Sequence, residues 1–500
     1  MNNISARILT GLGWNGANQI LGQVLQFGIS VILARLLSPR EFGLIGMVLV
    51  FLGFASSLSD MGLGASLVQR RSVSERHLNS VFWVNVAVGT LLTILLVLAA
   101  PLIANFFREP QLRLITTIIA LNIFLSSLNV VQNALLDRAL DFRTKFWIAS
   151  VSFLVSGIVA IILAYTGAGV WSLVGQSITS TAIQVAVMWR LSSWRPRLAF
   201  DLSAFKELMH FGGNLIAGNI VNYWGRNFDK LVIGRLLGSS VLGIYNLADK
   251  LMSLSITNVT NITSAVMFPA LSAMQDEVEY VKRTYLRATR MIALFTFPMM
   301  IGLSVLAEPA ILVVYGDKWQ ESISIMQVLC FSGLAQSIYF TSWWIFLSRG
   351  RTDIFFWWCI YTTPVRVIGV LVGAHWGIMG VAWAYVLGTY VFIGYPTWSS
   401  AGRLVNLKAK ELLRNLAGPF YCAVSMGVLL WISDRLILGG QVSGIRLIIQ
   451  VPLGILVYGF LIRQFRIEAF REFQKIILEK AGRQGRFIKW LAGDKTRAKA

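Results

Sequence analysis

Long apolar stretches alternate with short polar segments along the whole chain, and this pattern predicts its principal elements. Each stretch runs for roughly 18–28 residues, the length that a helix needs to cross a hydrocarbon core about 30 Å thick. Runs of this length lack the two-residue alternation of a membrane β-barrel. The pattern predicts fourteen membrane-spanning helices, at residues 14–36, 42–58, 81–105, 113–135, 146–165, 170–189, 211–234, 242–268, 291–314, 323–348, 354–374, 378–399, 417–433 and 446–462.

Composition supports this interpretation. Of the 500 residues, 56% are apolar and 13% are charged, whereas an ordinary soluble domain is about 25% charged. We therefore expect an all-α polytopic membrane protein. The first residues, MNNISARILTGLGWNG, carry one arginine and lead directly into the first span, so we expect no cleavable signal peptide.

Basic residues predict the orientation of the spans. If the N-terminus is cytoplasmic, the connections on that side hold 20 Lys and Arg and the opposite connections hold 8. Basic residues concentrate on the cytoplasmic side of membrane proteins, so we expect both termini there. The net charge of +21 then reflects topology and contact with anionic lipids, and nucleic-acid binding is not expected. The tail, residues 463–491, is a candidate surface helix with Phe470, Phe473 and Ile477 on one face.

A short motif occurs twice, 200 residues apart. Residues 35–37 read RLL and are followed by Gly43, and residues 235–237 also read RLL and are followed by Gly243. Six spans separate the two copies, so both point the same way across the membrane. The motif therefore predicts a parallel repeat, one of the known transporter plans. The predicted parts are an N-terminal lobe (1–200), a C-terminal lobe (201–402), spans 13 and 14 (403–465) and a basic amphipathic cytoplasmic tail (466–500).

Several ordered stretches resemble a known family. They are VILARLLSPREFGLIGM, SDMGLGASLVQR, LLDRALDFRTKFWIA, GAGVWSLVGQ and NFDKLVIGRLLGSSVLGIYNLADKL. Together they resemble the polysaccharide-transporter branch of the MOP (multidrug/oligosaccharidyl-lipid/polysaccharide) flippase superfamily, which includes the Wzx-type O-antigen and colanic-acid repeat-unit flippases. The resemblance covers about residues 5–465, and Asp229 and Lys230 match a recurrent pattern of the family.

The resemblance implies a MATE-like fold with two lobes around a central cavity that opens alternately to each side. It implies translocation of undecaprenyl-pyrophosphate-linked oligosaccharides across the bacterial inner membrane. The implied partners are this lipid-linked substrate, membrane lipids, and a polysaccharide polymerase with its export machinery.

Span 7 carries Arg226, Asp229 and Lys230 at bilayer depth. A charge there costs about 2.5–3.5 kcal/mol on insertion scales, so these side chains should face the bundle interior or water. Asp229 neutralises only one of the two cations, which lie four residues apart on one helical face. Either the charges form an internal ion pair that joins two spans, or the surplus cation binds an anionic headgroup. We predict all three as substrate-binding residues, with both alternatives open.

Arg366 is a further buried cation, two residues after Pro364. Proline removes a helical hydrogen bond and bends the helix. The pair is compatible with a moving joint beside a substrate-binding cation and with a static bend. We predict Arg366 as a substrate-binding residue.

Amide side chains recur at helical spacing in several spans. Those predicted to bind substrate are Gln19 and Gln23 in span 1, Asn122 and Asn129 in span 4, and Asn222 in span 7. The aromatic side chains of Tyr223 and Trp224 are suited to sugar faces. Hydrogen bonds between helices explain any single stripe, whereas several stripes in one protein favour a hydrated cavity.

Alternative functions remain in other classes. An ion-coupled multidrug antiporter for small amphiphiles would favour acidic cavity residues for cationic drugs, and a lipid II flippase would share the chemistry proposed above. A membrane enzyme is not expected, because the longest external connection, near residues 434–445, has no acid–base constellation. The three cysteines and three histidines show no metal-site spacing, so we expect neither a metal nor another cofactor.

Overall fold

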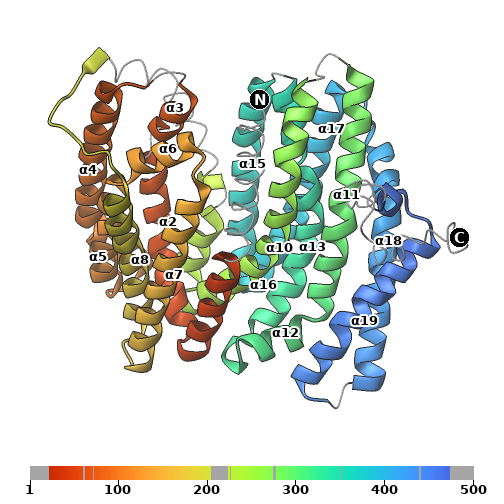
Figure 1. Ribbon diagram of the computed structural model, residues 1–500. Helices are drawn as coiled ribbons and strands as arrows, with labels where there is room; N and C mark the ends of the chain where they lie inside the picture. The colour runs from red at the N-terminus through yellow and green to blue at the C-terminus, as the bar shows by residue number, and fades with distance from the viewer. Residues whose placement is uncertain are drawn as a thin grey trace, which may run out of the picture. The chain divides into compact units, whose positions relative to one another are not determined.

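The structure, a computed structural model, describes residues 22–59, 62–70, 73–203, 223–225, 227–273, 277–349, 351–438, 441–472 and 474. Every regular element in these residues is a helix (Figure 1). Among the described helices, eight are long and apolar enough to cross a membrane, or nine if the bent pair α5 (Leu112–Ser127) and α6 (Val130–Ala139) counts as one span. The chain is therefore a multi-pass, all-helical membrane protein, and the count of fourteen spans stays a prediction.

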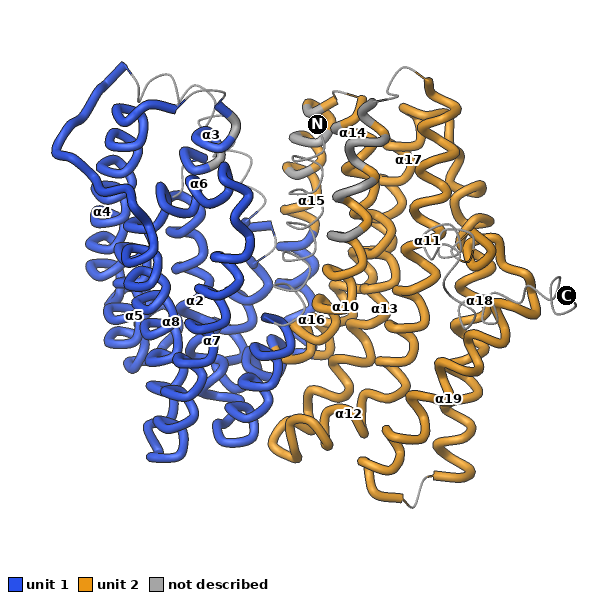
Figure 2. The backbone as a smooth tube through the Cα atoms, in the orientation of Figure 1, with its two compact units in different colours: residues 1–246, 366–378 blue, residues 247–365, 379–500 orange. Residues whose placement is uncertain are grey.

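The chain folds into two compact units (Figure 2). Unit 1 contains residues 1–246 and 366–378, and unit 2 contains residues 247–365 and 379–500. Three described helices contribute residues to both units, namely α10 (Ser239–Ala273), α15 (Thr352–Gly373) and α16 (Gly377–Leu387). The lobe boundaries proposed from the sequence repeat stay predictions.

Unit 1 is built from helices that pack against one another through clusters of apolar side chains. Its described helices are Gly22–Leu36, α2 (Pro39–Ser59), α3 (Leu63–Gln69), α4 (Glu75–Phe107), α5, α6, α7 (Phe142–Tyr165), α8 (Val170–Leu191), residues 227–236 and the first part of α10. Helix α4 packs along α5, and α7 packs along α8. Ile29, Leu33 and Leu37 recur every four residues, so they share one helical face. They pack against Ala160 of α7 and Leu173 of α8.

The span predicted at 113–135 is not one straight helix. It is broken at Leu128 and Asn129 into α5 and α6, which differ in direction by 44°. Two side chains stabilise the break. Ser127 Oγ donates to the Phe124 carbonyl at 2.6 Å, and Trp189 Nε1 donates to the Leu128 carbonyl at 3.1 Å. Such hydrogen bonds satisfy backbone carbonyls near the break, where the helical pattern ends.

Unit 2 contains the remaining helices. They are the second part of α10, α11 (Val278–Val305), α12 (Ala307–Val314), η1 (Asp317–Trp319), α13 (Ser322–Tyr339), α14 (Ser342–Ser348), the first part of α15, most of α16 (Gly377–Leu387), η3 (Gly388–Gly394), α17 (Tyr395–Leu404), α18 (Ala409–Ser433), η4 (Asp434–Leu438) and α19 (Ser443–Gln464). The first two residues of α16 and the short η2 (Ala374–Trp376) belong to unit 1. Helix α11 packs against α13 and α18. Tyr285, Ile292 and Met300, on α11, are almost fully buried.

Two boundaries in unit 2 differ from the sequence prediction. Residues 282–290 were expected to form a connection, yet they are helical because α11 begins at Val278. The span expected at 291–314 is divided, because Leu306 separates α11 from α12. Hydropathy detects the apolar part of a helix and not its polar extension, which explains the first difference.

The start of the C-terminal tail is held by ion pairs. Residues 468–472 are helical, and their carboxylates lie beside α11. Arg287 Nε lies 3.1 Å from Glu472, and Arg290 pairs with both Glu468 and Glu472. Of the amphipathic helix predicted over 463–491, residues 463 and 464 belong to α19 and the next described helix begins at residue 468; Phe473 and Ile477 lie outside the described residues.

Candidate functional site

Asp229 is a buried carboxylate with a neutral partner. It lies in the helical segment 227–236 and is 9% exposed. The Tyr245 hydroxyl, fully buried on α10, donates to Asp229 Oδ2 at 2.8 Å, and the backbone N–H of Lys230 donates to Oδ1 at 2.9 Å. Within the described residues Asp229 forms no ion pair, and so none with Lys230, one of the two cations considered for an internal pair. Arg226, the other expected partner, lies outside the described residues.

Arg366 contacts the same helical segment from α15. Its Nη1 donates to the backbone carbonyl of Gly225 at 3.2 Å. Gly225 precedes position 226 and lies one helical turn before Asp229. The structure therefore brings together two segments that the sequence analysis selected separately for their charges. Helix α15 continues through Pro364.

Tyr223 and Trp224, whose rings are suited to sugar faces, contact α2. Tyr223 donates its hydroxyl to the Val50 carbonyl at 2.6 Å. The ring of Phe54 lies 6.0 Å from the Tyr223 ring and 5.0 Å from the Trp224 ring, between centroids. Both residues are half-buried, so they keep part of their surface exposed, and their binding to sugar faces stays a prediction.

The two copies of the repeated motif contact each other. A Cβ atom placed on Gly43 would lie 1.7 Å from the Ser239 carbonyl oxygen, and one placed on Gly243 would lie 1.9 Å from the Pro39 carbonyl oxygen. The backbone nitrogen of each glycine lies 3.1 Å from the Cβ position of the other. The contact is therefore self-complementary under an offset of 200 residues, as at a two-fold axis. We call residues 39–43 and 239–243 the repeat contact.

Glu109 joins the two halves of the repeat contact. Its Oε2 accepts a hydrogen bond from Arg40 at 3.0 Å, and its Oε1 accepts one from Ser239 at 2.8 Å. Glu109 lies between α4 and α5, so a single carboxylate contacts one residue of each copy. The sequence analysis missed this residue, because a lone glutamate in a short connection gives no signal.

The amide side chains predicted to bind substrate differ in their surroundings. Asn122 Nδ2 donates to Ser177 Oγ of α8 at 2.9 Å, which is the hydrogen bond between helices that was the alternative to substrate contact. Asn129 is buried at the break between α5 and α6, so it does not share a continuous helical face with Asn122. Gln23 is half-buried in its helix. Gln19 and Asn222 lie outside the described residues.

A charged cluster at the ends of α18 and α19 was also missed. Arg446, 8% exposed, donates through Nε to Asp434 at 2.9 Å and through Nη2 to Asp434 and to Glu308 of α12, at 2.5 and 3.1 Å. Buried Gln450 donates to the same Asp434 at 2.8 Å. The sequence analysis counted Arg446 as an ordinary external basic residue, since its partners are remote in sequence.

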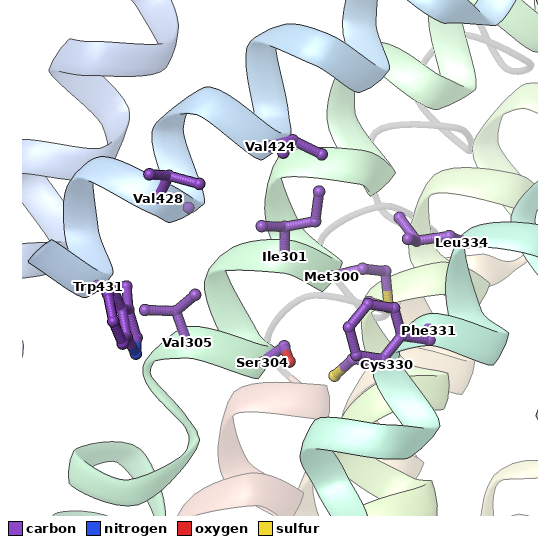
Figure 3. Close-up of a pocket in the computed structure, with 11 residues that line it drawn as sticks. Met300, Ile301, Ser304, Val305, Cys330, Phe331, Leu334, Val424, Val428 and Trp431 are labelled. Atoms are coloured by element: carbon purple, nitrogen blue, oxygen red, sulfur yellow. The ribbon is translucent and has the colours of Figure 1, made fainter. Parts of the chain in front are cut away.

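A cavity of about 280 Å³ lies among α11, α13 and α18 (Figure 3). It is lined by Met300, Ile301, Ser304, Val305, Cys330, Phe331, Leu334, Val424, Gly427, Val428 and Trp431. The lining contains no charged side chain, so this cavity cannot offset the charge of an anionic headgroup. In the described part of the chain, no cluster of His, Cys, Asp and Glu is arranged to hold a metal ion.

Comparisons with known proteins agree with the membrane fold. Residues 32–324 match the profile of a family described as polysaccharide biosynthesis protein. The teichuronic acid biosynthesis protein TuaB of Bacillus subtilis (strain 168) is 28% identical over 485 residues, which is 96% of this chain and 99% of TuaB. The lipopolysaccharide biosynthesis protein WzxC of Escherichia coli (strain K12) is 25% identical over 84% of this chain and 86% of its own.

A third relative and two solved structures complete the comparison. The succinoglycan biosynthesis transport protein ExoT of Rhizobium meliloti (strain 1021) is 27% identical over 78% of this chain and 80% of its own. The lipid II flippase MurJ in an inward closed conformation matches with a TM-score of 0.74 and 16% identity, over 90% of this chain and 98% of MurJ. An inward-facing MATE transporter of the MOP superfamily matches with a TM-score of 0.62 and 16% identity, over 78% of this chain and 96% of that transporter. The two structures establish the fold.

Proposed function

This chain belongs to the polysaccharide biosynthesis protein family, in the polysaccharide-transporter branch of the MOP superfamily, and on that premise we propose its function. It moves undecaprenyl-pyrophosphate-linked oligosaccharide repeat units from the cytoplasmic to the periplasmic leaflet of the bacterial inner membrane, by alternating access. It is a transporter and not an enzyme. Its partners are the lipid-linked substrate, membrane lipids, and the polymerase and export machinery that use the product to build O-antigen, capsule or exopolysaccharide.

The proposed topology has fourteen spans, with both termini in the cytoplasm. Spans 1–6 (residues 1–200) and 7–12 (201–402) form two lobes related by a parallel repeat, followed by spans 13 and 14 and the basic tail. The self-complementary contact of Gly43 with Gly243 supports this duplication, because repeats of the same orientation are related by an axis along the membrane normal. Reporter fusions that fluoresce only in the cytoplasm test it. Fluorescence at both ends is expected, and a dark C-terminal fusion would mean an odd number of spans.

One observation carries the proposed function, namely the contact between two charged segments at membrane depth. Arg366 donates to the backbone of Gly225, one turn before buried Asp229. The Asp229 carboxylate is held by the neutral Tyr245 hydroxyl, and in the described residues it neutralises no cation. A guanidinium at this depth normally faces a bundle interior or water, where it forms strong bidentate hydrogen bonds to phosphate or carboxylate. Arg366, with Arg226 and Lys230, therefore provides the chemistry that a pyrophosphate or acidic sugar needs.

Replacement of Arg366 tests this role. Arg366→Ala and Arg366→Lys would be expressed in a strain that lacks its own flippase, and surface polysaccharide and lipid-linked intermediate would be measured. A hydrogen bond that involves a charged group contributes about 1.5–3 kcal/mol, so we expect Arg366→Ala to reduce export at least about tenfold. Arg366→Lys should retain part of the activity, because the charge remains. Exposed Arg113 provides the control, as Arg113→Ala should export normally.

Protein level decides between transport and folding. If Arg366→Ala exports normally, the headgroup role is wrong. If the variant disappears from the membrane, Arg366 serves folding. A multidrug antiporter would instead confer resistance to cationic amphiphiles, and a lipid II flippase would sustain growth of a strain depleted of its own lipid II flippase. Neither phenotype is expected from the wild-type chain.

A further inference from the structure

A second pocket lies in unit 2. It has a volume of about 560 Å³ and is formed by α15 and α17, both labelled in Figure 1. It is lined by Asp353, Ile354, Trp357, Trp358, Tyr361, Tyr395, Pro396, Ser399, Ser400 and Arg403. Four of these ten side chains are aromatic and four others are charged or carry a hydroxyl group. No role has yet been assigned to any of them.

The pocket has a charged rim and an aromatic floor. Asp353 lies in the first turn of α15 and Arg403 lies in the last turn of α17, so both lie at the same end of this antiparallel pair. Tyr361 and Tyr395 each lie eight residues further into their helices, which is about 12 Å deeper at 1.5 Å per residue. The start of α15 and the end of α17 both adjoin connections rich in basic residues. The proposed topology assigns these connections to the cytoplasmic side. The pocket thus opens toward the side from which the substrate is taken.

The aromatic side chains of the pocket are exposed although they are large. Trp357 is 67% exposed, Tyr395 is 60% exposed and Tyr361 is 44% exposed. The Trp358 and Tyr361 rings contact each other, with centroids 5.5 Å apart. The ring faces of Trp and Tyr carry partial negative charge, so they attract the C–H groups that form the apolar face of a pyranose ring. Such exposed rings in a concave site are suited to a saccharide.

The polar side chains of the pocket fit the edge of a sugar. The Ser400 hydroxyl donates to the Pro396 carbonyl at 2.7 Å, so its oxygen can accept a hydrogen bond from a sugar hydroxyl. Asp353 forms a bidentate ion pair with Arg351 at 2.8 and 2.9 Å. Arg403 forms no ion pair with any described residue. Arg351 and Asp353 neutralise each other, so Arg403 gives the rim a net positive charge.

We propose that this pocket binds the saccharide head of an anionic lipid-linked substrate at the cytoplasmic side, before translocation. The proposal rests on the proposed function and extends it, because it names the residues that select the glycan. The rings of Trp357 and Tyr395 stack on sugar faces, and Arg403 binds a carboxylate of the saccharide. A simpler explanation of the aromatic residues is an interfacial belt, since Trp and Tyr are enriched where a membrane meets water. A belt needs neither a concave site nor a charged rim.

Binding of soluble saccharides to the purified full-length protein tests the proposal. The probes are tetragalacturonic acid, which is acidic, and maltotetraose, which is neutral, and affinity is measured by calorimetry. We expect the wild-type protein to bind the acidic probe more tightly. Trp357→Ala and Tyr395→Ala should weaken binding of both probes at least about tenfold, since such anchors dominate contact energies. Arg403→Gln should weaken binding of the acidic probe only.

Matched controls separate a saccharide site from an interfacial belt. Trp376 and Tyr165 are 72% and 73% exposed and lie outside the pocket, so Trp376→Ala and Tyr165→Ala should bind like wild type. Trp357→Phe keeps a ring and should restore most of the affinity. If the pocket variants and the controls bind alike, or if neither probe binds to wild type, the proposal is wrong. Inorganic pyrophosphate that binds through Arg403 without any saccharide binding would also overturn it, because the pocket would then recognise phosphate.

A transport assay separates this proposal from the proposed function. The same proteins are reconstituted into vesicles with the host's lipid-linked saccharides, and movement between leaflets is measured. If wild type and the pocket variants move the substrate equally, the pocket proposal fails and the flippase stands. If wild type moves no substrate while the saccharides bind to the pocket, the flippase fails and the pocket stands.

Discussion

Gly43 of α2 and Gly243 of α10 face each other so closely that neither position has room for a Cβ atom. Each glycine meets the backbone of the other copy of the motif, at Ser239 and at Pro39. Backbone oxygen cannot move aside as a flexible side chain can, so a substitution here must separate the two segments. In the proposed topology the repeat contact lies on the external side, where it would close the path to the periplasm.

Gly43→Ala should therefore open the repeat contact. Overpacking of a close contact costs about 1–3 kcal/mol, and the clash with the Ser239 carbonyl is direct. Ser239 is 4% exposed, so a Ser239→Cys thiol should react slowly with an impermeant maleimide added outside the cell. In the Gly43→Ala background the reaction should be at least about tenfold faster. Gly28 has open space around it, and Gly28→Ala should leave the reaction rate unchanged.

The Arg446 cluster should stabilise unit 2. Removing one member of a buried ion pair leaves an unpaired charge and costs about 3–5 kcal/mol. We expect Asp434→Asn to lower the unfolding temperature of the purified protein by several degrees. Glu308→Gln should have a smaller effect, because the Glu308 side chain is 50% exposed. An unchanged unfolding temperature of Asp434→Asn would show that the cluster is not stabilising, and Arg435→Gln, beside it and exposed, is the control.

Saccharide binding at the pocket of α15 and α17 should be independent of pH between 5 and 8. The hydrogen bonds from Arg351 lower the pKa of Asp353 to about 2. A carboxyl whose pKa is depressed in the folded state contributes its stabilisation above its unfolded pKa and loses it as the pH falls through the folded value. The pH range in which Asp353 loses its charge and its stabilising effect therefore lies between about pH 4 and pH 2, below the tested range. A change in tetragalacturonate affinity between pH 5 and 8 would point to another titrating group.

Pro364 should affect transport more than stability. Proline removes one hydrogen bond within α15 and weakens the helix two residues before Arg366. Pro364→Ala would restore that bond and stiffen the helix, so we expect slower export at normal protein level. Export at the wild-type rate would exclude a moving joint at Pro364. Pro452 lies inside α19, outside both repeats, and Pro452→Ala is the matched control.

Much of the helical fold could be predicted from hydropathy, whereas the repeated motif predicted a duplication and not the contact between Gly43 and Gly243. The break at Leu128 and Asn129 could not, because averaging over a window hides two residues within an apolar run. The bend is stabilised by Trp189, which is remote in sequence. Hydropathy reports the mean polarity of a segment and not its local hydrogen bonds.

The candidate site was harder to predict, because neither hydropathy nor residue type reports which side chains meet in the fold. Asp229 was selected correctly as a buried charge, yet its partner Tyr245 lies on a different helix and has no charge. Tyr223 and Trp224 are suited to sugar by their chemistry, and only the fold shows that they also pack against Phe54 of α2. Trp357 and Tyr395 were overlooked because they are far apart in sequence, and only the packing of α15 with α17 brings them to one pocket. Residue type indicates what a side chain can do, and the fold decides which partner it meets.

The main chain on both sides of the repeat contact also limits how the duplicated halves can diverge. After a gene duplication, two copies usually drift apart freely wherever each touches only its own surroundings. Here a new methyl group in either copy collides with the opposite copy, so both must remain without a side chain at the same register. A chimaera built from the two halves must therefore keep glycine at positions 43 and 243, and also at 238, where a φ of +92° would strain any side chain.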